Sequence, residues 1–130
     1  MDVNILDQEE RKKLLGLIYK LACCDGEYAD EEKEIISNYK IELDVHEISD
    51  TDSINELCDY FATKPEKIRK IVMFEVLGMI LADKKFVPEE VEVFNSIKKS
   101  FSLNDRDMTE IISHATTLQK EYDQVYDVLF

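Results

Sequence analysis

The chain has 130 residues, and its 29 acidic and 16 basic side chains give a formal net charge of −13 at neutral pH. The length fits one domain spanning residues 1–130, and an apolar fraction of 45% indicates a folded globule rather than a disordered chain. A strongly negative chain repels phosphate backbones, which argues against direct nucleic-acid binding, and no apolar run reaches the roughly 18 residues that a membrane-spanning helix needs.

The first third of the chain has helical periodicity. Asp7 and Glu10 have the spacing of a capping box, so a first helix is expected to begin there and to stop near Gly26. A second helix is predicted from near Asp30 to near Leu43. The apolar stripe of the first helix consists of Leu14, Leu15, Ile18, Leu21 and Ala22, and that of the second consists of Ile35, Ile36 and Tyr39.

The polar stretch 44–52 is expected to be a loop that leads to a short third helix over 54–61. Thr63 and Glu66 have capping-box spacing in front of a fourth helix, whose first turn tolerates Pro65. That helix is apolar on nearly every side, which predicts a place in the middle of the bundle. Its apolar residues are Ile68, Ile71, Val72, Phe74, Val76, Leu77, Ile80 and Leu81.

Further helices are expected after this central one. Pro88 suits the first position of a fifth helix, and Asn104 with Asp107 opens a sixth. Only three Gly and two Pro are available for tight turns, so the chain is predicted to be all-α, a single-domain bundle of about seven helices. The seventh is suggested by the apolar stripe of Leu118, Tyr122, Val125, Tyr126 and Leu129.

The most informative feature is an internal repeat. Residues 21–32 read LACCDGEYADEE and residues 79–90 read MILADKKFVPEE, so Asp25 and Asp83 are 58 residues apart (83 − 25 = 58). Each copy is an apolar helix, an Asp-containing turn and an acidic helix start. This predicts a helical hairpin duplicated about a pseudo-twofold axis, with repeats at about 14–43 and 72–101 that share one core. The offset pairs Tyr28 with Phe86, Glu31 and Glu32 with Glu89 and Glu90, and Ile36 with Phe94.

The repeated carboxylates suggest a cation site. An aspartate at a helix C-terminus meets the negative end of the helix dipole, which costs about 0.3–1 kcal/mol, yet Asp25 and Asp83 both occupy such a position. Clusters of oxygen ligands are what Ca²⁺ and Mg²⁺ prefer. The sequence therefore predicts a divalent-cation site of this class in which Asp25 and Glu32 are the primary ligands and Asp83 and Glu90 a weaker second pair. Glu27, Glu31 and Glu89 are expected around them.

Two alternatives stay open for these acids. Glutamate in the first turn of a helix is ordinary helix design, which would explain Glu32 and Glu90 without a metal. A site shared by all four carboxylates also requires both turns to lie at one end of the bundle. An EF-hand is excluded, because Gly26 directly follows Asp25 where that loop needs its glycine at the sixth position.

The run Asp25-Gly26-Glu27, followed by Tyr28 and by Glu31-Glu32 at a helix start, resembles the TerB-like tellurite-resistance domain. The resemblance extends over roughly residues 14–103 and includes the second copy. It implies an all-α bundle and a suspected divalent-cation site on Asp25 and Glu32 and on Asp83 and Glu90. It also implies a stress or tellurite-response context and no known catalytic step. The second turn departs from the family pattern, because Lys84 and Lys85 replace the glycine and the polar residue, and either ammonium could pair with Asp83 in place of a metal.

Other chemistry-bearing residues favour no reaction. His46 lies in the acidic loop and reads as a solvated histidine, and His114 on the sixth helix has no nucleophile paired with it by any spacing rule. Cys23 and Cys24 are adjacent and lack the spacing of a zinc site. Nucleotide-binding, hydrolase and metalloprotease motifs are absent from the sequence. We therefore expect a protein that is not an enzyme.

The leading interpretation is a non-enzymatic module that binds a divalent cation at its acidic inter-helical turns. The alternative is a metal-free acidic scaffold that holds a partner through its acidic face or through the C-terminal stripe that ends at Phe130. The expected partner is a protein, either basic or membrane-associated, and a homo-oligomer stays open. A cytoplasmic location is expected, since the N-terminus lacks a signal pattern and the cysteine count is odd.

Overall fold

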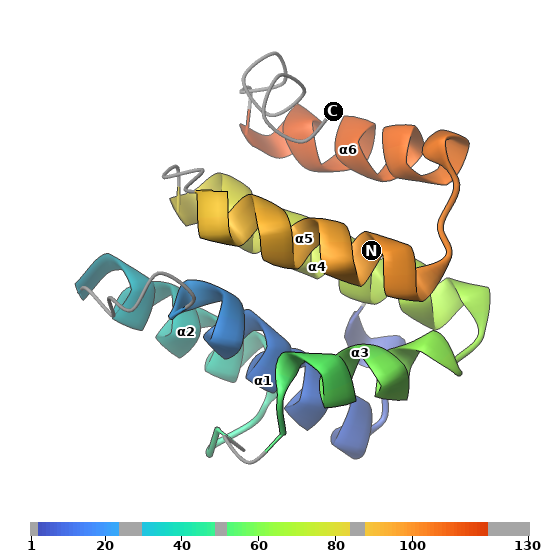
Figure 1. Ribbon diagram of the computed structural model, residues 1–130. Helices are drawn as coiled ribbons and strands as arrows, with labels where there is room; N and C mark the ends of the chain where they lie inside the picture. Colours follow the sequence, from blue (N-terminus) through green and yellow to red (C-terminus); the bar gives the residue numbers. More distant parts are fainter. Residues whose placement is uncertain (1–2, 24–29, 49–51, 84–87, 120–130) are drawn as a thin grey trace.

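The computed structural model describes residues 3–23, 30–48, 52–83 and 88–119 (Figure 1). Over these ranges the chain forms helices and no strand, so the predicted all-α class is confirmed. A short 3₁₀ helix precedes six α-helices. Their bounds are Val3–Ile5 for the 3₁₀ helix, and Gln8–Ala22 (α1), Asp30–Leu43 (α2), Ile54–Ala62 (α3), Glu66–Asp83 (α4), Pro88–Phe101 (α5) and Asp105–Gln119 (α6).

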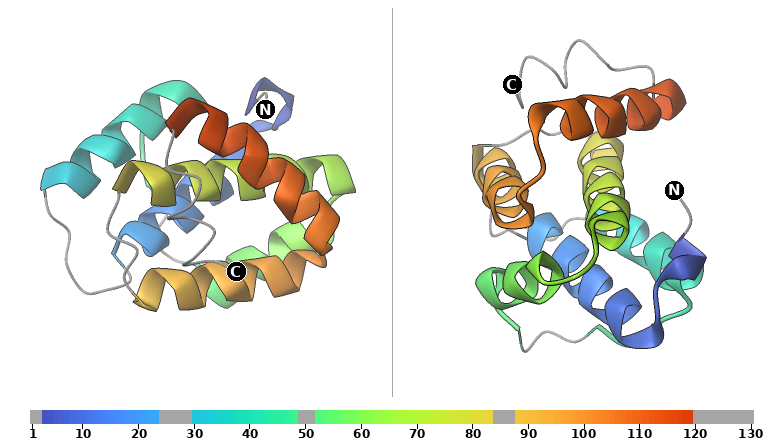
Figure 2. Two further views of the ribbon diagram at one scale, coloured as in Figure 1. Left: turned by 90° about the horizontal axis from the view of Figure 1, so that it is seen from above. Right: turned by 90° about the vertical axis from the view of Figure 1, so that its right-hand side faces the viewer.

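The helix α4 lies in the middle of the bundle, as its all-round apolar sequence predicts. It contacts every other α-helix, and α6 packs across it on the side away from α1 and α3 (Figure 2). The apolar stripes expected for α1 and α4 are buried wherever their side chains are described, except at Phe74, which is half-buried. The largest fully buried side chains are Phe61, Phe94, Phe101, Leu14, Leu15, Leu17, Ile18, Leu21, Ile36, Leu43, Leu57 and Met73.

The helix starts agree with the sequence in two places. The Asp7 carboxylate accepts a hydrogen bond from the Glu10 backbone N–H (2.7 Å), and the Glu10 carboxylate accepts one from the Asp7 N–H (2.8 Å), so the predicted capping box is confirmed. The Asn104 side chain accepts from the Asp107 N–H at the start of α6 (2.8 Å). Both caps satisfy backbone donors that the helix itself leaves unpaired.

The capping box predicted for Thr63 and Glu66 is wrong. The Thr63 hydroxyl donates to the Tyr60 carbonyl (3.0 Å) and belongs to the end of α3. The carbonyl of Pro65 accepts the first hydrogen bonds of α4, from the N–H groups of Ile68 and Arg69, so the helix starts too late for Thr63 to cap it.

A different capping box, which the sequence analysis missed, opens α3. The Ser53 hydroxyl accepts from the Glu56 N–H (3.1 Å) and the Glu56 carboxylate accepts from the Ser53 N–H (3.2 Å). At the other end of the chain, α6 continues through Leu118, where a seventh helix was expected to begin. The rest of that expected helix lies outside the described residues.

Two arginines make the same contacts in the two hairpins. Arg11 donates from Nε to the carbonyl five residues earlier (3.1 Å) and from Nη1 to the carbonyl of Leu43 (3.3 Å). Fifty-eight residues later (69 − 11 = 58), Arg69 donates from Nε to the carbonyl five residues earlier (3.1 Å) and from Nη1 to the carbonyl of Phe101. Leu43 and Phe101 are the last residues of α2 and α5, so each guanidinium fixes the open end of its hairpin.

The backbone repeats at the same offset. Asp44 and Ser102, which follow α2 and α5, both have left-handed backbones, with φ of 55° and 54°. This conformation costs a residue other than glycine about 1–2 kcal/mol. In each copy the next residue returns to the core, where Val45 is 2% exposed and Leu103 is 7% exposed. The equivalence of the two hairpins therefore extends from the sequence to backbone angles and side-chain contacts.

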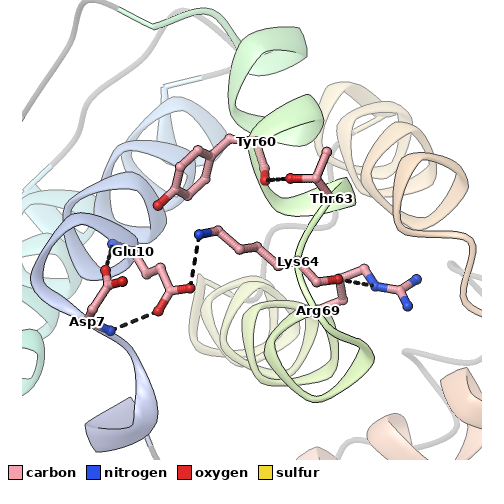
Figure 3. Close-up of polar contacts among 6 residues, drawn as sticks. All are labelled: Asp7, Glu10, Tyr60, Thr63, Lys64 and Arg69. Atoms are coloured by element: carbon pink, nitrogen blue, oxygen red, sulfur yellow. Dashed lines mark hydrogen bonds and ion pairs between the residues drawn. The ribbon is translucent and has the colours of Figure 1, made fainter.

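A polar network joins the start of α1 to the corner between α3 and α4 (Figure 3). The Lys64 ammonium lies 3.4 Å from the Glu10 carboxylate and 4.7 Å from the centre of the Tyr60 ring. The Lys64 carbonyl is the acceptor for Arg69, so one residue connects the first capping box to the second arginine. This network links the start of the first hairpin to the start of the second, at the end of the bundle opposite their turns.

Candidate functional site

The two hairpins turn at the same end of the bundle. α1 ends at Ala22 and α4 at Asp83, whereas α2 begins at Asp30 and α5 at Pro88. These four helix ends lie together on the left in Figure 1 and in the left-hand view of Figure 2. The arrangement meets the geometric condition that a site shared by both turns requires.

Two glutamates are buried at equivalent positions at this end. Glu32 is the third residue of α2 and is 1% exposed, and Glu90 is the third residue of α5 and is 3% exposed. Four residues further along each helix lie Ile36 and Phe94, both in the core. Because residues four apart share a helix face, the helical repeat turns both carboxylates toward the interior.

Burial of these carboxylates has to be compensated. Removing a carboxylate from water costs several kcal/mol, whereas the dipole at a helix N-terminus returns at most about 2 kcal/mol. The Oε2 atom of each group is shielded from solvent. The part of the desolvation cost that the helix dipole does not offset must be compensated by hydrogen bonds or by a positive charge beside each carboxylate.

The other predicted ligands are less fully described. Asp25 and Glu27 lie outside the described residues, as do Lys84 and Lys85 of the second turn. Asp83 is the last residue of α4 and Glu31 the second residue of α2, and only their backbones are described. Glu89 is exposed at the start of α5. Of the predicted ligands, those whose described side chains lie in the core at this end are therefore Glu32 and Glu90.

The side chains that are described do not complete a metal site by themselves. Within that part of the chain, no group of three or more His, Cys, Asp or Glu residues is placed to hold an ion. Asp25 and Glu27 fall outside it, so the predicted four-carboxylate arrangement stays a prediction.

The remaining chemistry-bearing residues are dispersed. His46 is exposed, with Nε2 4.0 Å from the Asp44 carboxylate, and His114 is exposed on α6. Cys58 is 2% exposed and belongs to the core, and burial raises the pKa of its thiol. Cys23 is half-buried at the end of α1.

Sequence reasoning missed one buried acid away from the turns. Glu75 is 6% exposed in the interior of α4. Burial, followed by the neighbouring charge of Glu42, raises the pKa of Glu75 to about 7. The signal was present, since Glu75 is the one charged residue between Lys70 and Asp83 in the sequence.

Comparison of the chain with protein-family models, curated proteins and solved structures finds no match in any of the three. Within the described ranges, none of the helices combines the length and the apolar composition that crossing a bilayer demands.

Proposed function

We propose that this chain is a non-enzymatic, TerB-like helical module that binds a divalent cation of the Ca²⁺ or Mg²⁺ class at its acidic inter-helical turns. Glu32 and Glu90 are the ligands contributed by α2 and α5. Asp25 and Asp83 complete the set from the preceding turns, and the surrounding glutamates attract the ion. A stress or tellurite-response context is part of this proposal.

The burial of Glu32 and Glu90 is the observation that carries it. Two carboxylates at the same position of two hairpins, 1% and 3% exposed, are costly to keep in a small core. A hard cation would compensate both charges and would prefer oxygen ligands. The helix ends around them lie at one end of the bundle, which allows the turns to contribute together (Figure 1).

A cation held there would act on stability. It would link the end of α1 to the start of α2, and the end of α4 to the start of α5, at the end of each hairpin that the arginines do not fix. An ion that binds only the folded state stabilises it by about 2.7 kcal/mol at a concentration one hundred times its Kd.

Calorimetric titration with Ca²⁺, Mg²⁺, Mn²⁺ and Zn²⁺ tests the proposal. A chain of charge −13 condenses cations non-specifically, so the comparison needs a charge-matched control. Glu34 and Glu92 are exposed on α2 and α5 and are also 58 residues apart (92 − 34 = 58). E32Q/E90Q should abolish the specific isotherm and E34Q/E92Q should retain it. Equal isotherms for the two variants would exclude this site.

A metal-free acidic scaffold is the second candidate, and a groove between α3 and α5 favours it. The groove has a volume of about 390 Å³ and is lined by Ile54, Asn55, Glu89, Glu92, Val93 and Ser96. Its described lining offers two carboxylates, two aliphatic side chains and no basic group. This composition suits a basic protein segment with an aliphatic side chain between its charges.

Binding of a peptide of alternating lysine and leucine, measured in chelator, distinguishes the two candidates. The scaffold predicts metal-independent binding that E89Q/E92Q weakens and that E34Q/E110Q, a change of the same charge at exposed sites, leaves intact. Equal weakening by both variants would show that only net charge attracts the peptide.

A further inference from the structure

Glu75 occupies a position that the repeat reserves for an apolar residue. It lies 58 residues after Leu17 (75 − 17 = 58), which is 0% exposed in α1. Glu75 itself is 6% exposed, and its neighbours Val72, Val76 and Met79 on α4 are all at 0%. The second hairpin therefore carries an ionisable group where the first carries a core leucine.

The helix that faces this group is α2. The Tyr39 hydroxyl donates a hydrogen bond to the backbone carbonyl of Glu75 (3.1 Å). Gly78, one turn further along α4, lies beside the same hydroxyl, and a Cβ there would lie 3.5 Å from it, an ordinary contact distance. α2 and α4 are thus in contact at the backbone of Glu75.

The charged groups around Glu75 do not offset the cost of ionising its carboxyl group. Glu42 of α2 is a like charge and raises its pKa, whereas the positive amino terminus of the chain lowers it by less. Tyr39 stays protonated, because burial and the two glutamates raise the pKa of its phenol. From α6 the described residues buried in the shared core are the apolar Met108, Ile111 and Ile112. Within the described residues, Glu42 of α2 is the charged side chain that acts on Glu75.

We propose that Glu75 is a proton-operated contact between α2 and α4: in its neutral form it stays buried beneath Tyr39, and when ionised it is repelled by Glu42 and loosens α2. The observation behind this is a buried carboxyl group on the central helix, at the residue where a second helix that carries a carboxylate of its own contacts it. The contact is far along α2 from Glu32, so the proposal does not depend on cation binding.

The direction of the pH effect follows from linkage. The pKa of Glu75 is raised from 4.5 to about 7 in the closed form. A raised pKa means that the closed form binds the proton more tightly, so its contribution is complete below pH 4.5 and is lost as the pH rises through 7. For one proton this corresponds to a decrease of about tenfold in the closing equilibrium between pH 6 and pH 8.

Hydrogen exchange on the full chain at pH 6 and pH 8, corrected for intrinsic exchange rates, tests the proposal. Protection of amides in residues 35–43 should decrease about tenfold in the wild type and stay constant in E75Q, whose side chain mimics the neutral acid. E42Q should move the transition to lower pH by removing the like charge. E34Q, which removes an exposed charge from the same helix, should behave as the wild type.

Carboxyl ¹³C NMR of the wild type measures the titration midpoint of Glu75 directly and does not depend on a variant that folds. A Glu75 midpoint near 7 is expected, with a transition in the α2 amides at the same pH. A midpoint near 4.5, an unchanged α2 between pH 6 and pH 8, or an equal loss of protection in E75Q would each overturn the proposal.

Discussion

Arg11 and Arg69 stand at equivalent positions of the two hairpins, and each guanidinium joins the backbone before its own helix to the last carbonyl of the helix that returns beside it. A cation at a helix C-terminus is favourable because it meets the negative end of the dipole. The rigid fork of arginine also presents donors on two separate nitrogens in a fixed geometry, which the single ammonium of lysine does not. These contacts set the open ends of both hairpins and so determine how the turns at the other end lie.

Replacing either arginine should destabilise the fold. R11M and R69M each lose two hydrogen bonds from a charged donor and are expected to cost about 2–4 kcal/mol in urea unfolding. R11K should recover less than half of the loss, because it restores the charge without the fork. R106M removes an exposed arginine of α6 and should stay within about 0.5 kcal/mol of the wild type. Equal losses for R11M and R106M would contradict this account of the hairpin ends.

The capping contacts predict different losses of stability for two similar hydroxyl residues, Ser53 and Thr63. S53A removes the hydroxyl that caps α3 and should cost about 1 kcal/mol. T63A removes a hydroxyl that donates only to the exposed Tyr60 carbonyl, and should cost clearly less. The comparison is made by thermal unfolding of both variants. A larger loss for T63A would mean that Thr63 caps α4 after all.

Gly78 offers a stabilising substitution. A Cβ at this position would meet the Tyr39 hydroxyl at 3.5 Å, an ordinary contact distance, and alanine is favoured over glycine inside a helix by about 0.5–1 kcal/mol. G78A should therefore raise the free energy of unfolding by up to that amount. Y39F should lower it by about 0.5–1.5 kcal/mol through loss of the hydrogen bond to α4. A destabilised G78A would show that the Tyr39 ring has no room to adjust.

Much of the fold could be predicted from the sequence, because the repeat and the helical periodicity are both strong. The bounds of α2 and α5, Asp30–Leu43 and Pro88–Phe101, differ by 58 at each end, as the paired motifs imply (88 − 30 = 58; 101 − 43 = 58). The arginine contacts could have been found by extending the repeat upstream from Leu14 to Arg11. The left-handed Asp44 and Ser102 could not, since neither is a glycine.

The candidate site could also be predicted from the sequence only in part. Burial of Glu32 and Glu90 follows from their place one turn before Ile36 and Phe94 on the core-facing stripe. Sequence alone could not say that both hairpins turn at one end, because that depends on how α4 packs against α1 and α2. Glu75 was overlooked because a single charge does not alter the periodicity of a helix that is apolar all round.

The central claim is that the two buried glutamates are ligands of a divalent cation. Crystals of the protein grown with Mn²⁺ and measured at an anomalous wavelength test it most directly. The account predicts an anomalous peak within about 2.0–2.6 Å of carboxylate oxygens of Glu32, Glu90 or both, at the end of the bundle where α2 and α5 begin. Peaks confined to exposed acids, with Glu32 and Glu90 held by side chains of the protein alone, would contradict it.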